Sequence, residues 1–110
     1  MKKYLCIIKV KPECREEYIK IHKNPWPEML EALSEAGFQN ETIWYFEDQS
    51  IIYYECEDLE ESDIKVRATE VCKRWDLEMI PRFLEGPVVA EKIFDLRNQL
   101  AGLDPEGNEK

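Results

Sequence analysis

The chain has 110 residues, a formal net charge of −9 at pH 7 and a sequence pI near 4.7. This length fits one domain, and a hydrophobic content of 44% excludes an intrinsically disordered chain. An acidic protein repels phosphate backbones, so we expect no nucleic-acid partner. No segment approaches the roughly 18 apolar residues of a membrane span, and Tyr4 to Ile8 is too short for a signal-peptide core. We therefore expect no membrane partner and a cytoplasmic location.

The four cysteines are scattered along the chain and form no CxxC pair: Cys6, Cys14, Cys56 and Cys72. This spacing favours small buried hydrophobic residues in a reducing compartment over a disulfide framework. The chain has a single histidine and no clustered thiols, so we expect no metal site.

The first third of the chain predicts one strand and two helices. Lys3 to Val10 is rich in β-forming residues, and Pro12 to Lys23 has helical spacing. Pro25 disfavours helical geometry in the residue before it, so the first helix should end or kink there. A second helix is expected from Glu28 to Ala36, with Gly37 as its C-terminal cap.

The rest of the chain predicts a hairpin, more helix and a last strand. Thr42 to Phe46 and Ile51 to Cys56 should pair across a polar turn. Helical character follows in Ile64 to Arg67 and Glu70 to Met79. After Pro81 and Gly86-Pro87, Val88 to Leu96 is the expected last strand.

This order of elements is the β-α-β-β-α-β arrangement of an α+β ferredoxin-like fold, an antiparallel sheet with helices on one face. We expect a single domain over residues 1–97 and a polar C-terminal tail over residues 98–110. The first strand is apolar on both sides, so the uncovered face needs a second layer. A symmetric homodimer that stacks or closes the two sheets would supply it.

The first candidate site is the pair Tyr18 and His22, which are four residues apart and share one helical face. An imidazole has a reference pKa of about 6.5, suitable for giving and taking protons at neutral pH. The alternative is a helix-terminal histidine that packs beside a tyrosine or favours the C-terminal dipole.

Three tryptophans on separate elements form the second candidate: Trp26, Trp44 and Trp75. Aromatic faces stack on the apolar faces of pyranose rings, so a fold that brings these residues together would suit a sugar. The alternative is that they are core residues. Asp76, beside Trp75, is either an acceptor for a ligand hydroxyl or a solvated helix carboxylate.

Other reaction classes find little support. The chain has no GxSxG motif, no convincing partner set for a serine or cysteine nucleophile, and no glycine-rich phosphate loop. Carboxylates are plentiful, but no spacing singles out a glycosidase pair.

Two motifs together resemble the bacterial L-rhamnose mutarotase family. The first is Tyr18-x-x-x-His22 followed by Asn24-Pro25-Trp26-Pro27-Glu28, and the second is Val71-Cys72-Lys73-Arg74-Trp75. The resemblance covers Lys3 to Phe94. It implies a dimeric ferredoxin-like α+β barrel with no metal and no cofactor, which interconverts the α and β anomers of a 6-deoxy-hexose.

The resemblance also implies roles for individual residues. His22 corresponds to the proton donor, Tyr18 to a substrate contact, and Trp75 to the first of two adjacent tryptophans at the sugar site. The second tryptophan is replaced by Asp76, and a tyrosine usual near the start of the second strand is Glu41. A tryptophan followed by an acid is similar to related L-fucose mutarotases.

Mutarotation needs one group that protonates the ring oxygen and one that deprotonates the anomeric hydroxyl. We expect His22 to act on one of these oxygens, with Tyr18 orienting it or the sugar, and Asp76 and Glu41 as candidates for the second group. L-Rhamnose is the expected substrate and L-fucose the alternative. Two other functions compete: a dimeric module that binds a small molecule without turning it over, and a monooxygenase-like enzyme acting on an aromatic substrate.

Overall fold

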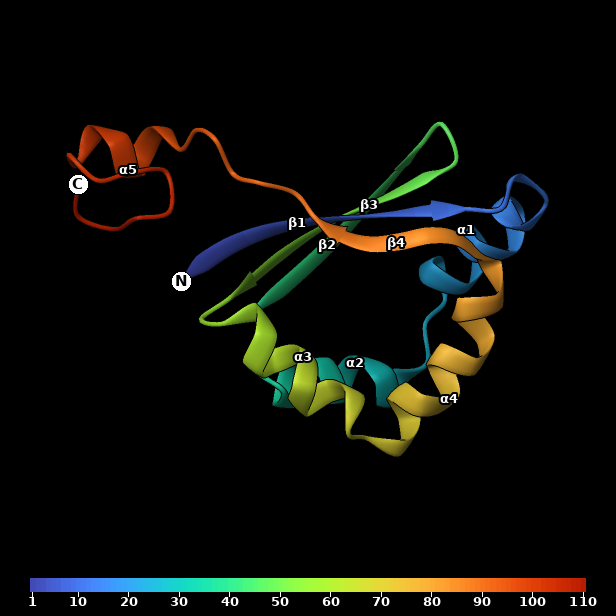
Figure 1. Cartoon of the computed structure of the whole chain (residues 1–110). Helices are drawn as coiled ribbons and strands as arrows, with labels where there is room; N and C mark the ends of the chain where they lie inside the picture. The colour runs from blue at the N-terminus through green and yellow to red at the C-terminus, as the bar shows by residue number, and fades with distance from the viewer.

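The computed structural model describes residues 1–110 and contains one four-stranded antiparallel sheet with the strand order β2-β3-β1-β4 (Figure 1). Its strands are β1 (Lys2–Val10), β2 (Asn40–Phe46), β3 (Gln49–Cys56) and β4 (Phe83–Val89). Two pairs of helices connect them: α1 (Arg15–Lys23) with α2 (Pro27–Glu35), and α3 (Leu59–Arg67) with α4 (Glu70–Met79). All four helices lie on the same face of the sheet (Figure 1), which confirms the predicted ferredoxin-like α+β fold.

Local sequence explains where the helices begin and end. As predicted, α1 ends just before Pro25, and Pro27 is the first residue of α2, where its missing N–H has no intrahelical role. Thr69 caps α4 by accepting a hydrogen bond from the backbone N–H of Cys72, and the side chain of Asp58 caps α3 in the same way. Short 3-10 turns, Pro12–Cys14 and Ile80–Arg82, precede α1 and follow α4.

Two sharp turns depend on positive φ angles. The hairpin between β2 and β3 turns on Glu47 and Asp48, with φ of 49° and 58°, which matches the twist of the flanking strands. Gly37 follows α2 with φ of 104°, as expected for a C-terminal cap. A Cβ at Gly37 would also lie 3.0 Å from the Ser62 hydroxyl oxygen. A larger residue is therefore disfavoured both by the positive φ angle and by this close contact.

The last strand was wrongly predicted over Val88 to Leu96, because β4 covers Phe83–Val89. Gly86 and Pro87 were interpreted as a break, whereas they lie inside β4 at a shift in its register with β1. A Cβ at Gly86 would stand 2.7 Å from the Ile7 carbonyl oxygen, so glycine permits this close approach of the two backbones.

The core fills the space between the inner face of the sheet and the helices. One cluster joins α2, α3 and α4 to the end of β3, and the other lies on the sheet beneath α1 and α4. Trp75, on α4, packs against both clusters. The four cysteines are free, and Cys6, Cys56 and Cys72 are buried, as predicted for small hydrophobic residues, whereas Cys14 is only partly buried.

Beyond β4 the chain leaves the sheet and forms α5 (Leu96–Leu100) at a distance from the other helices (Figure 1). The segment then turns back, with an isolated β-bridge between Leu103 and Glu109. α5 straddles the predicted boundary between residues 1–97 and the tail of residues 98–110, so this division stays a prediction. None of the helices has the length and apolar composition that crossing a bilayer requires.

Candidate active site

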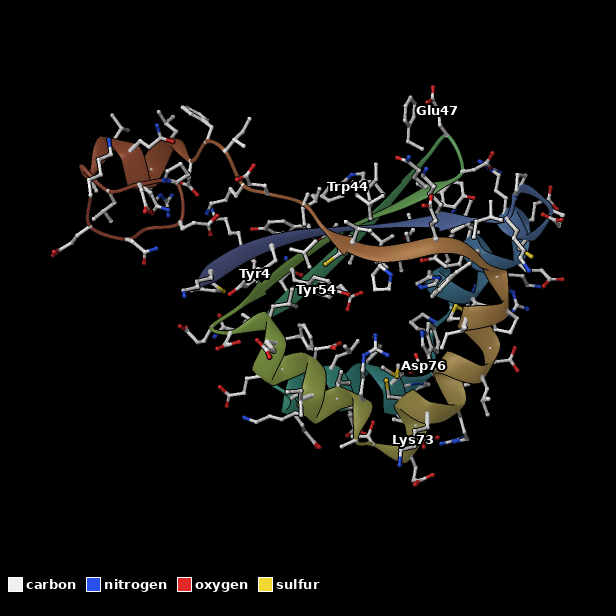
Figure 2. All side chains as sticks on the ribbon, in the orientation of Figure 1. Tyr4, Trp44, Glu47, Tyr54, Lys73 and Asp76 are labelled. Atoms are coloured by element: carbon white, nitrogen blue, oxygen red, sulfur yellow. The ribbon has the colours of Figure 1, made fainter.

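A cavity of about 690 Å³ lies between the inner face of the sheet and the helices. Small-molecule sites usually have volumes of about 300–1,000 Å³. The wall combines apolar side chains with aromatic and polar ones, among them Tyr18, His22, Glu41, Tyr54, Asp63, Arg67, Trp75 and Asp76. In Figure 2, Tyr54 lies on the side of the sheet that faces the helices, and Asp76 lies across from it on α4.

His22 is held in one orientation at the end of α1. Its Nδ1 lies 2.8 Å from the Tyr18 carbonyl oxygen, and because a carbonyl only accepts, Nδ1 carries the hydrogen. The neutral ring then has an unprotonated Nε2 for a ligand. Burial lowers the pKa of His22, against a smaller raising effect of the hydrogen bond to Tyr18. The imidazole is therefore a base at neutral pH.

Tyr18 supports this histidine with its ring as well as its backbone. The two ring centroids are 4.2 Å apart, and the Tyr18 hydroxyl donates a hydrogen bond of 2.7 Å to Ser50 Oγ on β3. Burial raises the pKa of Tyr18 to about 12, so its phenol stays protonated. Tyr18 thus anchors the end of α1 to the sheet and fixes the position of His22.

Two of the three tryptophans meet beside the histidine. The Trp75 ring lies edge-on to His22, with centroids 5.4 Å apart, and to Trp26, with centroids 5.2 Å apart. Trp44 is 56% exposed and stands on the outer face of the sheet (Figure 2). The expectation that all three would gather was therefore wrong for Trp44, because its neighbour Ile43 faces the cavity and successive strand residues face opposite sides.

Asp76 is part of an ion-pair network that the sequence did not predict. Its carboxylate accepts a hydrogen bond of 3.0 Å from Arg67, and Arg67 also lies 3.0 Å from both carboxylate oxygens of Asp63. Since the Asp63 and Arg67 side chains are about half exposed, the network stands where the cavity opens to solvent. The i,i+4 spacing of Asp63 and Arg67 was the available signal. Their reach to Asp76 depends on how α3 packs on α4.

Glu41 projects from β2 into the cavity without a charged partner. It is directly opposite Tyr54 in the β2–β3 register and makes no ion pair or hydrogen bond with another protein group. Burial raises the pKa of Glu41 to about 7, and burial together with this nearby carboxyl raises the pKa of Tyr54. Tyr54 was missed by the sequence analysis, although strand alternation with the buried Ile52 places it on the inner face.

The fold and site define a class of protein: a small ferredoxin-like α+β domain with an aromatic-walled pocket and groups suited to general acid–base chemistry. Comparison with known proteins narrows this class. A family model described as L-rhamnose mutarotase matches residues 3–97. The L-rhamnose mutarotase of Bacillus subtilis strain 168 is 40% identical over 99 residues, which are 88% of this chain and 94% of that protein. The chain belongs to the L-rhamnose mutarotase family.

Solved structures share the fold at lower identity. The crystal structure of L-rhamnose mutarotase from Formosa agariphila has a TM-score of 0.70 at 17% identity, covering 86% of this chain and 98% of that one. A putative antibiotic biosynthesis monooxygenase from Bordetella bronchiseptica has a TM-score of 0.64 at 14% identity, covering 84% and 96%. At such identities the likeness shows the fold alone, so the sequence family separates the mutarotase from the monooxygenase-like interpretation.

Proposed function

We propose that this protein interconverts the α and β anomers of L-rhamnose by acid–base opening and closure of the pyranose ring. The observation that carries the proposal is the neutral imidazole of His22, held against Trp75 in a cavity large enough for a sugar. Membership of the L-rhamnose mutarotase family supports L-rhamnose over L-fucose as the substrate.

Mutarotation requires positioned groups that transfer protons, and this site contains such groups. Ring opening moves one proton onto the ring oxygen and takes one from the anomeric hydroxyl. The free aldehyde then rotates, and closure on its other face gives the opposite anomer. Positioned proton transfer of this kind typically contributes about 10²–10⁴-fold in rate. His22 is the proton-transfer group that works at one of the two oxygens, and Tyr18 holds its ring in place.

The remaining wall residues account for binding. The Trp75 indole offers an apolar face to the sugar ring. Its packing against Trp26 holds the indole in position. Asp76 accepts hydrogen bonds from sugar hydroxyls, and its pairing with Arg67 balances the charge that a ligand would otherwise have to cover. A carboxylate in this place favours hydroxyl recognition over apolar stacking.

The active form is proposed to be a homodimer joined through the outer face of the sheet. Several large apolar side chains gather on that face, and Trp44, Phe46 and Val88 among them are more than half exposed: Leu5, Ile7, Trp44, Phe46, Ile51, Tyr53 and Val88. A patch of this kind marks an interaction surface, and the same patch on two copies gives a self-complementary interface. The free cysteines suit a reducing compartment, in line with a proposed cytoplasmic location.

Saturation-transfer NMR tests the reaction directly. The measurement inverts or saturates the anomeric resonance of one L-rhamnose anomer and follows transfer to the other, with L-fucose run in parallel. We expect the protein to raise the exchange rate well above that of buffer, more strongly for L-rhamnose. His22→Ala should lower the protein-dependent rate by about 10²-fold or more.

The control for this experiment is Lys20→Ala, an exposed change on the same helix, which should exchange the anomers as fast as the unmodified protein. Exchange by His22→Ala at the unmodified rate would refute the role of His22. A protein that exchanges neither sugar faster than buffer would point instead to a binding module.

A further inference from the structure

We propose that Glu41 is the second catalytic group of this site, exchanging a proton with the sugar from the side of the cavity opposite His22. The inference rests on the proposed mutarotase function and assigns the proton-transfer partner which that function requires. Three observations carry it: the register of the β2–β3 hairpin, the distribution of charge in the cavity, and the titratable groups around Glu41.

The register places Glu41 and the point where Tyr18 anchors α1 at opposite ends of one inner surface of the sheet. Three successive pairs form the inner face of the hairpin: Glu41 with Tyr54, Ile43 with Ile52, and Tyr45 with Ser50. The hydroxyl of Tyr18 bonds Ser50, so the α1 end of the site stands over the third pair, whereas Glu41 belongs to the first. With a rise of about 3.3 Å per residue, the first and third pairs are about 13 Å apart. The apolar middle pair is the surface on which a sugar ring would rest, with Glu41 at one end and α1, which carries His22 one turn beyond Tyr18, over the other end.

The charges distinguish Glu41 from the other acids in the cavity. Asp63 and Asp76 both bond Arg67, so each has a cation to balance it. Glu41 has none. Removing an unpaired carboxylate from water is costly, and the group responds by keeping its proton. Glu41 is therefore poised as an acid at the same pH at which His22 is poised as a base.

The titratable and charged groups around Glu41 come from every element that lines the cavity or acts on this carboxyl: Cys6 on β1, Tyr45 on β2, Tyr54 on β3, Arg15, Tyr18, His22 and Lys23 on α1, Asp63 and Arg67 on α3, and Asp76 on α4. Burial raises the pKa of Cys6 to about 11 and that of Tyr18 to about 12, and it raises the pKa of Tyr54 as well. These groups hold their protons near neutral pH, and Arg67 holds its charge. Burial raises the pKa of Glu41 to about 7, so its carboxyl gains and loses a proton near neutrality, whereas burial lowers the pKa of His22 and so favours a neutral imidazole there.

The proton count closes over a full cycle. In ring opening, the Glu41 carboxyl gives its proton to the ring oxygen as the bond from that oxygen to the anomeric carbon breaks. His22 takes the anomeric hydroxyl proton as the carbonyl forms. The open-chain state holds a Glu41 carboxylate and a His22 imidazolium. After the aldehyde rotates, closure returns the proton from His22 to the new anomeric oxygen and the proton of the sugar hydroxyl to Glu41.

The test compares the pH dependence of anomer exchange in the unmodified protein and in Glu41→Gln, which keeps the size of the side chain and removes its titration. The unmodified protein should show a bell-shaped profile. Its rate falls on the alkaline side as Glu41 loses its proton near pH 7, and on the acid side as His22 gains one. Glu41→Gln should lower the rate by about 10²-fold and lose the alkaline limb near pH 7 in any residual activity. Glu31→Gln, the same change at an exposed position on α2, should leave rate and profile unaltered.

A titration of the protein itself gives an answer that does not depend on turnover. In carboxyl-detected ¹³C NMR, the Glu41 resonance is identified by its loss in Glu41→Asp. It should titrate near pH 7, and a midpoint at the ordinary value of about 4.3 would overturn the proposal. So would Glu41→Gln exchanging the anomers at the unmodified rate and with the unmodified profile. If His22→Ala is inactive at the same time, the mutarotase function stands and only the assignment of Glu41 falls. Should the unmodified protein itself fail to exceed buffer, the function falls.

Discussion

The two faces of the sheet arise from the same strands and differ in what they leave unsatisfied. On the inner face the helices exclude water, and the unfavourable groups there are polar. Glu41 is largely buried, and its carboxyl has no ion-pair or hydrogen-bond partner. On the outer face no layer of helices covers the end of β2, and large apolar side chains are exposed to solvent there: Trp44 is 56% exposed and Phe46 64%. The buried carboxyl and the exposed apolar side chains both cost stability in the isolated chain, and a different kind of partner would relieve each cost. The inner face is suited to a small polar molecule, and the outer face is suited to another protein surface.

Ser50 shows that a buried polar group is not by itself a sign of function. Its side chain is completely buried, yet its hydroxyl oxygen accepts the hydrogen bond of Tyr18, so no ligand is needed to satisfy it. Glu41, two pairs further along the same inner face, has no such bond. A buried polar side chain therefore points to a ligand only where it lacks a hydrogen-bond partner within the protein. In the same way, an apolar side chain on the outer face points to a partner only where no other part of the chain covers it.

The largest predicted effect comes from making the outer face resemble an ordinary solvent-exposed face. Ile51 lies between Ile7 and Trp44 in the register, at the centre of the apolar patch. In a two-fold interface, Ile51→Lys would bury two unpaired charges, so we expect the dimer to weaken by about 4 kcal/mol, roughly 1,000-fold in the dissociation constant. Sedimentation equilibrium at a series of concentrations measures this.

Ile64→Lys is the matched control, because Ile64 is an exposed isoleucine on α3, away from the outer face. It should leave the assembly unaltered. A monomeric unmodified protein, or an Ile51→Lys variant that dimerises as well as its parent, would contradict the assignment of the outer face to a second copy.

Much of this two-faced arrangement is visible in the sequence. Strand alternation, the prolines around Trp26 and the glycine after α2 were enough to predict the element order and the apolar first strand. The pairing of Tyr18 with His22 was also predictable, because four residues along a helix fix two side chains relative to each other. Local periodicity therefore predicts the order of the elements and the relative positions of side chains within one element.

What the sequence could not predict depends on contacts between elements. The alternation rule would have placed Trp44 opposite to Glu41, but only if the register and the covered face were already known. Gly86 and Pro87 look like a break until β1 is seen to approach them closely. The bond from Arg67 to Asp76 joins two helices at a junction whose angle no local pattern specifies. The network around Asp76 was therefore missed, although Asp76 itself was named.

The second predicted effect is the loss of folding stability caused by burying the unpaired Glu41 carboxylate on the inner face. Glu41 has a pKa of about 7 in the folded protein against an unperturbed 4.5, so the folded state binds the proton more tightly than the unfolded state. The contribution of Glu41 to the free energy of unfolding is then most favourable below pH 4.5, and it is lost as the pH rises to about 7. Glu41→Gln should therefore be more stable than its parent at pH 8, by up to about 3 kcal/mol, with the difference vanishing near pH 4.5.

Urea unfolding at pH 4.5, 6 and 8 measures this difference. The effect of His22 has the opposite sign, because its lowered pKa makes stability fall as the solution becomes acidic, but it is present in both proteins and cancels. Glu31→Gln should show no such pH-dependent gain. An equal stability difference for Glu41→Gln at all three pH values would mean that the carboxyl is not strained by burial.

The smallest predicted effect lies at the mouth of the cavity, where the inner face meets solvent. Arg67→Met keeps the apolar stem of the side chain and removes the cation that bonds Asp63 and Asp76. Because the Arg67 side chain is 48% exposed, water screens the loss, and we expect only about 0.5–1 kcal/mol, or a two- to fivefold rise in KM for the sugar. The maximal exchange rate should change little, since Arg67 touches no atom that gains or loses a proton. Lys65→Met, which breaks the ion pair to Glu61 on the same helix, should leave KM unaltered. A fall in the maximal rate larger than the rise in KM would place Arg67 in the chemistry rather than in the binding of hydroxyls.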